Sequence, residues 1–107
     1  MNPELIKALE QVQKMQEEVS KIQETLGGIT ASSESGGGMV KVTANGHGEI
    51  ILIKLEKEVI DPNEQEMLED LIVAAANRAL AKAKELADQK MSGVANNFLP
   101  HMPGLRK

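Results

Sequence analysis

The sequence predicts an α+β fold: a long N-terminal helix, a three-stranded antiparallel meander and a long C-terminal helix. Three observations lead to this prediction. Residues 3–26 carry a heptad pattern of apolar residues, residues 29–55 alternate around two glycine-rich turns, and residues 61–91 carry an alanine-rich helical pattern. With 107 residues in all, we expect one domain over residues 1–95 and a mobile tail over residues 96–107.

The first helix is predicted from apolar residues at alternating steps of three and four, a period of 3.5 that is typical of a helix packed along another helix. Asn2 is the expected N-cap, and Pro3 suits the first turn. The helix is expected to run to about Leu26 and to end at Gly27-Gly28. The apolar seam consists of Leu5, Ala8, Val12, Met15, Val19, Ile22 and Leu26.

Three short segments show the patterns of strands. Residues 29–34 alternate weakly between apolar and polar, residues 39–44 alternate clearly, and residues 49–55 are apolar at almost every position. Residues 35–38 and 45–48 separate them as turns. The second turn, Asn-Gly-His-Gly, is a strong hairpin signal.

The third strand is apolar on both faces, which predicts that both faces are covered. Ile51 and Ile53 belong to one face, and Ile50 and Leu52 belong to the other. One meander with two helices has too few elements to cover both faces, whereas two copies of the chain have enough. We therefore expect a homodimer with Ile50, Ile51, Leu52 and Ile53 in its core.

The second helix has a clear start signal, because Asp61 is a good N-cap, Pro62 suits the first helical position and Glu64 follows at the spacing of a capping box. The helix is expected to fade around Met91–Gly93. Small alanines on its apolar stripe would let another helix approach closely. The stripe consists of Leu68, Leu71, Ile72, Ala75, Ala79, Ala83 and Leu86.

Composition and spacing exclude several classes of function. The chain has a net charge of -4, no cysteine and a single aromatic residue, Phe98, which argues against disulfides, thiolate metal sites and base stacking on single strands. His47 and His101 lie at no metal-ligand spacing, and no nucleophile-and-base arrangement occurs. We therefore expect no enzyme, metal or cofactor. Without a long apolar run or a leader pattern, we expect no membrane segment and a cytoplasmic protein.

Two stretches are specific in combination. Gly38 to Gly46 follows the pattern G-x-V-K-V-T-x-N-G, and Glu66 to Leu71 reads E-M-L-E-D-L, with Asp61-Pro62 between them. Over residues 3 to about 95, the chain resembles the YbaB/EbfC family of bacterial nucleoid-associated proteins. The resemblance implies a tweezer-like homodimer in which a joint α/β core carries paired helical arms. It also implies that the arms bind double-stranded DNA and that the protein associates with the nucleoid.

If the helical arms bind DNA, exposed cations on both helices are the expected phosphate contacts: Lys7, Lys14, Lys21, Arg78 and Lys82. The three lysines recur every seven residues and form one stripe. An alternative for two of them is an intrahelical ion pair with a glutamate four residues earlier, Glu10 or Glu17. Alternatives for Lys82 are an ion pair with Glu85 or a stem lying over the edge of the core.

A second hypothesis comes from a different class of function. The acidic net charge also suits an interaction or adaptor module with little DNA affinity of its own. In that case the coiled-coil seam of residues 3–26 and the methionine-bearing tail bind another protein, whose identity the sequence leaves open. Binding to duplex DNA, and its dependence on salt, discriminates between the two hypotheses.

Overall fold

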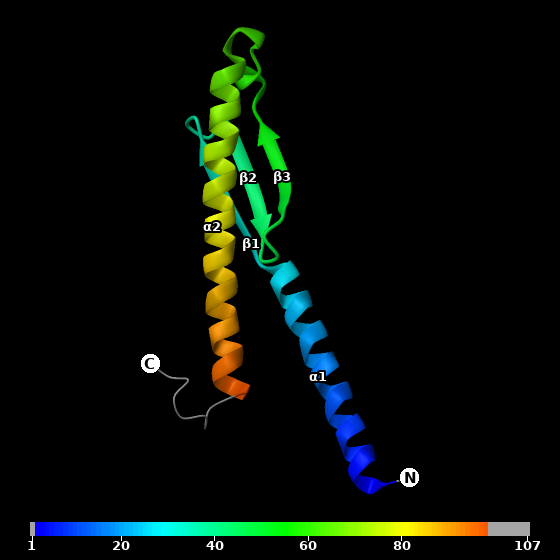
Figure 1. The fold of residues 1–107 in the computed structure, drawn as a ribbon. Coiled ribbons are helices and arrows are strands. Elements are labelled where there is room, and N and C mark those ends of the chain that lie inside the picture. Colours follow the sequence, from blue (N-terminus) through cyan, green and yellow to red (C-terminus); the bar gives the residue numbers. More distant parts are fainter. Residues whose placement is uncertain (1, 99–107) are drawn as a thin grey trace.

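The computed structural model describes residues 2–98, with side chains described up to Gly93. The order of elements confirms the predicted α+β fold (Figure 1). They are α1 (Pro3–Gly28), β1 (Thr30–Ser35), β2 (Val40–Asn45), β3 (Ile50–Leu55), the 3-10 turns η1 (Lys57–Val59) and η2 (Pro62–Glu64), and α2 (Gln65–Phe98). No helix within residues 2–98 combines the length and the apolar character that a membrane crossing requires.

The helix α1 begins as predicted and ends close to the predicted residue. The Asn2 side chain accepts a hydrogen bond from the Glu4 backbone N–H at 2.9 Å, and Pro3 opens the helix. The helix ends at Gly28, and neither Gly27 nor Gly28 takes a left-handed conformation. None of its residues is buried, and the predicted apolar seam is exposed from Leu5 to Val19 in the single chain, whereas Ile22 and Leu26 at its end are half-buried.

The three strands form one antiparallel sheet in the order β1-β2-β3, and each begins within one residue of its predicted start. Val40, Val42 and Ala44 are fully buried on one face, as the alternation predicts. A β-bulge interrupts the pairing of β2 with β3 between Thr43 and Ala44. Ala44 pairs with Ile50 and Thr43 with Leu52, which leaves the intervening residue of β3 without a partner.

The helix α2 packs along β1 and β2, and this contact forms the core of the chain (Figure 1). Ala75, Ala79 and Ala83 are fully buried against the sheet. The small alanines thus permit a close approach, as the sequence indicated, but within the chain the element that approaches them is the sheet and not another helix. The stripe continues at Ala87, 6% exposed, rather than at Leu86, 43% exposed, since four-residue steps keep one face.

We expect replacement of Ala79 by leucine to lower the free energy of unfolding by about 1–3 kcal/mol or more, because the buried site has no room for three more carbons. Ala81→Leu is the matched control, since Ala81 is exposed on the same helix and should change stability by less than about 0.5 kcal/mol. Thermal denaturation of both variants measures the difference. Equal melting temperatures would show that the interface between α2 and the sheet accommodates the larger side chain.

The start of α2 follows the predicted signal, with a 3-10 turn in front. The Asp61 carboxylate accepts a hydrogen bond from the Asn63 backbone N–H at 3.0 Å, and Pro62 opens η2. The α-helical part then begins at Gln65. The Glu64 backbone N–H donates to the Asp61 carbonyl oxygen, and the Glu64 side chain does not bond to the Asp61 backbone. Only the part of a capping box that the Asp61 side chain supplies is therefore present.

The predicted end of α2 was wrong. The helix passes through Met91–Gly93 and continues to Phe98, so residues 96–98 of the predicted tail are helical. One glycine inside a helix costs only about 1 kcal/mol. The first residue that cannot continue the helix is Pro100, and helices usually end at or before the residue that precedes a proline. Residues 99–107 of the predicted tail lie outside the described residues.

The strand β3 is only partly covered by the single chain, since α2 lies along β1 and β2 (Figure 1). The four residues predicted for the dimer core are each about half exposed: Ile50 43%, Ile51 52%, Leu52 52% and Ile53 45%. Ile53 and Ile50 lie opposite Val42 and Ala44, on the face that α2 partly covers, whereas Leu52 lies on the other face. The prediction that Ile50 shares a face with Leu52 was therefore wrong, because the β-bulge changes the alternation between them. These residues do not belong to the core of one chain, and the homodimer stays a prediction.

Candidate nucleic-acid interface

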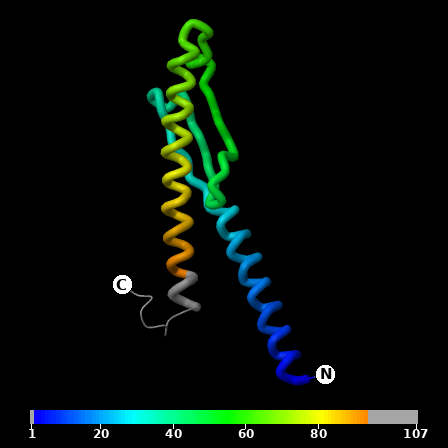
Figure 2. The backbone as a smooth tube through the Cα atoms, in the orientation of Figure 1, coloured from blue at the N-terminus to red at the C-terminus, as the bar shows by residue number. Residues whose placement is uncertain are grey.

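The helix α1 extends from the body of the protein as a free arm. Its 26 residues give it a length of about 39 Å, and it runs away from the sheet and from α2 (Figures 1 and 2). The chain measures 72 × 34 × 16 Å, an elongated shape that offers long outer surfaces. A functional surface on this protein is therefore to be sought on the outside of the helices.

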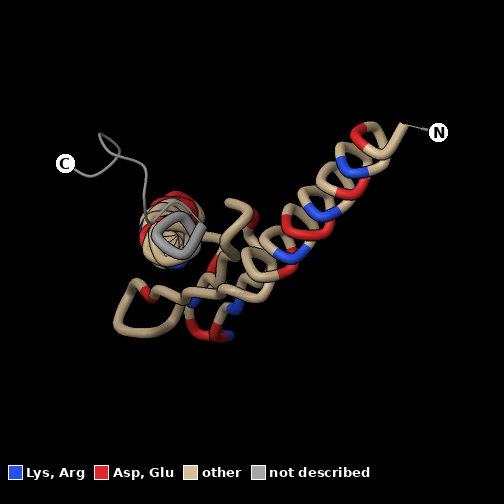
Figure 3. The backbone as a smooth tube through the Cα atoms, turned by 90° about the horizontal axis from the view of Figure 1, so that it is seen from below, with Lys and Arg blue, Asp and Glu red and all other residues tan. Residues whose placement is uncertain are grey.

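The three predicted lysines of α1, Lys7, Lys14 and Lys21, are all exposed and recur along the arm (Figure 3). Neither Lys14 nor Lys21 forms the alternative ion pair with Glu10 or Glu17. Within residues 2–93 the structure contains one ion pair, Lys84–Asp88 on α2, at 3.4 Å. The lysine row of α1 is therefore available to an external anion.

The arm as a whole is not basic. It carries five glutamates and three lysines, and each lysine has a glutamate three residues further along: Glu10, Glu17 and Glu24. Figure 3 shows the resulting alternation of positive and negative positions along α1. On a helix, three residues correspond to most of one turn, so the lysines form a narrow positive row beside a parallel negative row. Such a row favours contact with phosphates along one line only.

The two predicted cations of α2 have backbone partners within the chain. The Arg78 Nε donates to the Ala74 carbonyl at 3.3 Å, within its own helix. The Lys82 Nζ donates to the carbonyl of Ser32 in β1 at 3.2 Å. The Lys82 ammonium group therefore bonds to a backbone carbonyl of the sheet and does not form the alternative ion pair with Glu85. Its stem crosses from α2 to the edge strand β1, where it occupies one of the carbonyls that another strand would need.

The structure does not bring the two sets of cations together within one chain. The row on α1 and the pair Arg78 and Lys82 lie on helices that diverge from the region of the β2–β3 turn (Figure 1). A single chain therefore presents two separate groups of positive charge. For all five residues to contact one duplex, the duplex must lie across both helices, or a second copy must supply one of the groups.

One pair of exposed cations was not predicted from the sequence as a candidate site. Lys41 and Lys54 lie directly opposite each other on β2 and β3, and both are exposed. They point to the face of the sheet opposite to Val40 and Val42, because side chains alternate along a strand. Their Cβ atoms are about 5 Å apart at this kind of position, so the two charges repel. The two lysines lie opposite each other only because the β-bulge at Thr43/Ala44 shifts the pairing of β2 with β3 by one residue. No pattern in the sequence predicted this bulge.

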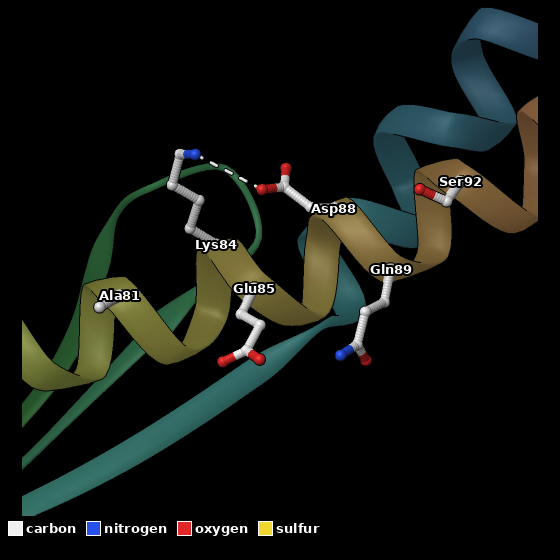
Figure 4. Close-up of a pocket in the computed structure, with 6 residues that line it drawn as sticks. All are labelled: Ala81, Lys84, Glu85, Asp88, Gln89 and Ser92. Carbon is white, nitrogen blue, oxygen red and sulfur yellow. Dashed lines mark hydrogen bonds and ion pairs between the residues drawn. The ribbon is translucent and has the colours of Figure 1, made fainter. Parts of the chain in front are cut away.

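A shallow hollow on the outer side of α2 carries charges of both signs (Figure 4). Lys84 and Asp88 form the ion pair across it, with Glu85 beside them. The lysine is therefore neutralised locally, which makes this part of α2 a poor surface for phosphate. The remaining lining residues are Ala81, Gln89 and Ser92.

A long helix that leaves most of its surface open to solvent, as α1 does, is typical of proteins that present helices to a partner. The chain belongs to the YbaB/EbfC DNA-binding family, whose model matches residues 1–98. This match confirms the resemblance found in the sequence.

Individual relatives agree with the family. The chain is 45% identical over 105 residues to a nucleoid-associated protein of Pelotomaculum thermopropionicum, a match that covers 98% of each chain. It is 51% identical over 98 residues to a nucleoid-associated protein of Thermodesulfovibrio yellowstonii, covering 91% of this chain and 86% of the relative. A crystal structure of an uncharacterized protein from Helicobacter pylori has a similar fold, with a TM-score of 0.56 and 25% identity over 82% of this chain and 98% of that one.

Proposed function

We propose that this protein binds double-stranded DNA as a homodimer through its helices and serves as an architectural protein of the nucleoid, within the cytoplasm, without catalytic activity. The observation that carries the proposal is the row of Lys7, Lys14 and Lys21, which is exposed on a protruding helix and forms no ion pair among the described side chains. Membership in a DNA-binding family supports it. Lys82 and Arg78 are proposed as secondary contacts, since each already has a backbone partner.

The spacing of the row suits contact with a DNA backbone. Successive lysines are seven residues apart, which places them about 10 Å apart along the helix axis. Contacts between lysine and phosphate position a protein on DNA without reading the base sequence. A protein with a net charge of -4 is repelled by DNA elsewhere on its surface, so the arm is proposed to approach with its lysine row first.

The proposed homodimer rests on β3. Its four consecutive apolar residues Ile50–Ile53 are about half exposed, and β3 is an edge strand whose outer backbone groups pair with no other strand of residues 2–98. The other edge strand, β1, has one carbonyl occupied by Lys82. A dimer through β3 would give one body two α1 arms, and simultaneous engagement of both arms raises affinity without any new kind of contact.

A salt titration of duplex binding tests the proposal. We expect log affinity to fall linearly with log salt with a slope between about -3 and -5, as three to six phosphate contacts would give. Fluorescence anisotropy with two duplexes of unrelated sequence measures the slope, and the two duplexes should bind equally. Absence of binding to either duplex at roughly 50 mM salt would contradict DNA binding as the primary function.

The exposed seam of α1 supports a second candidate function, that of a protein-interaction module. Leu5, Val12 and Met15 are 51%, 50% and 67% exposed in the single chain, and they lie on one face of the arm. In this case the apolar seam of α1, not the lysine row, is the functional surface. The same titration discriminates, because an interaction module of this kind has no reason to bind duplex DNA at low salt.

A further inference from the structure

The arm α1 is attached to the body at a small joint next to the β2–β3 turn. The Leu26 carbonyl, near the end of α1, accepts hydrogen bonds from two backbone N–H groups, that of Ile29 at 3.2 Å and that of Gly46 at 3.0 Å. The Gly46 N–H also donates a hydrogen bond to the Ile29 carbonyl oxygen at 3.0 Å. The last turn of a helix leaves carbonyls without intrahelical partners, and here the hairpin turn supplies one.

Gly46 leaves no room for a side chain at this joint. A Cβ atom at this position would lie 2.4 Å from the Leu26 carbonyl oxygen and 3.1 Å from its carbon. Both are backbone atoms, so no rotation of a side chain relieves the overlap. Gly46 is not among the residues with positive φ, unlike Gly48 at +79°. The contact with α1, and not the local backbone conformation, therefore requires glycine at position 46.

The turn that carries Gly46 is held rigidly by its neighbour. The Asn45 side chain is 7% exposed, and its carbonyl oxygen accepts from the backbone N–H of His47 at 3.0 Å and of Glu49 at 3.1 Å. Its amide also donates to the Glu49 carboxylate at 3.0 Å. Because these bonds fix the turn, the overlap between a Cβ at Gly46 and the backbone of Leu26 would be relieved mainly by movement of α1.

We propose that Gly46 is a positioning residue that seats the end of α1 on the β2–β3 turn and sets the direction of the arm. The inference rests on the proposed function, because it matters for DNA only if α1 is a DNA-binding arm. Two arms can engage one duplex only when both point correctly. The affinity for DNA then depends on a residue that contacts no DNA.

The direction of the arm can be measured directly, since the chain has no cysteine of its own. Spin labels on cysteines at Gln13 of α1 and Gln89 of α2, both exposed, report the distance between the two helices by pulsed electron paramagnetic resonance. Dilution with unlabelled protein restricts the signal to pairs within one chain. For Gly46→Ala the base of α1 must move by about 1 Å to reach ordinary van der Waals contact, and leverage along the arm should change the label distance by about 3 Å or more.

Two glycines nearby serve as matched controls. A Cβ at Gly48 meets nothing within 4 Å, so Gly48→Ala strains the same turn without touching α1. A Cβ at Gly28 also meets nothing within 4 Å, so Gly28→Ala changes the end of α1 without touching the turn. Both controls should keep the label distance of the wild type, with Gly48→Ala losing stability through its positive φ.

We expect Gly46→Ala to shift the label distance and to weaken duplex binding by roughly tenfold or more while circular dichroism shows a folded protein. An unchanged distance in the folded variant would overturn the joint, whatever the DNA affinity. A shifted distance with wild-type DNA affinity would leave the joint in place and would instead contradict the use of α1 as a DNA-binding arm. If Gly46→Ala does not fold, the label distance in the wild-type protein tests the proposal. An arm held in one direction by the joint gives one narrow distance distribution, and a broad distribution would overturn the proposal.

Discussion

Replacement of Ile53 by aspartate is expected to dissociate the proposed homodimer and to lower the free energy of unfolding by about 3 kcal/mol or more. Ile53 lies opposite Val42 on the face of the sheet that carries the core, and the single chain leaves it 45% exposed. If a second copy covers β3, the substitution buries a carboxylate that has no cationic partner. Analytical ultracentrifugation at micromolar concentration and thermal denaturation measure the two effects.

The neighbouring position supplies a matched control. Lys54→Asp introduces the same side chain into the same strand, one residue further on, at a site that is already charged and exposed. It changes strand propensity and net charge but places no charge at a buried apolar position, so it should leave the proposed dimer intact. A wild-type protein that sediments as a stable monomer at micromolar concentration would contradict the homodimer itself. A dimeric Ile53→Asp variant of unchanged stability would remove β3 from the interface.

Most of the helices, strands and turns could be predicted from the sequence because its local signals agree with one another. The Asn2 and Pro3 start of α1, the Asp61 and Pro62 start before α2, and the glycine-rich turns each act over a few residues. Such signals need no knowledge of the rest of the chain. The end of α2 was missed for the same reason, since Gly93 weakens a helix locally while the helix continues to Phe98.

Contacts across the fold could not be predicted in this way. Ala79 indicated a close approach but not whether a helix or a sheet makes it. The bond from Lys82 to the Ser32 carbonyl joins residues 50 positions apart, and nothing in the local pattern around either residue points to the other. Lys41 and Lys54 oppose each other only because a bulge shifts the register. Of the candidate site, the sequence placed the lysine row of α1 correctly in solvent and left the partners of the α2 cations unknown.

The joint at Gly46 shows why a short motif can be informative for a reason that its pattern does not reveal. An Asn-Gly pair in a hairpin usually indicates that the turn needs left-handed backbone conformations. Here Gly46 does not adopt one, and Gly48 does. The glycine at 46 is required by the carbonyl of Leu26, a residue of another element. The turn could be predicted from the sequence, but its contact with the arm could not.

Simultaneous replacement of Lys7, Lys14 and Lys21 by alanine is expected to weaken duplex binding about equally for all sequences and to flatten the salt slope by up to about 3 units per engaged arm. The reason is that all three are exposed, lie in one row and form no ion pair with any side chain of residues 2–93. The fold should survive, because α1 has no buried residue to lose. Mobility shifts at several salt concentrations, with circular dichroism to confirm folding, measure the effect.

Two further triple variants separate position from charge. Replacement of the same lysines by arginine keeps the row positive and should retain binding. Replacement of Lys57, Lys84 and Lys90 by alanine removes as much positive charge from outside α1 and should cost much less affinity, because Lys84 is already paired with Asp88 and none of the three lies on the arm. If both alanine variants lose affinity equally, the effect comes from net charge and the arm has no special role. If a folded protein without the row binds DNA as the wild type does, the contact lies elsewhere, and the exposed pair of Lys41 and Lys54 becomes the next site to test.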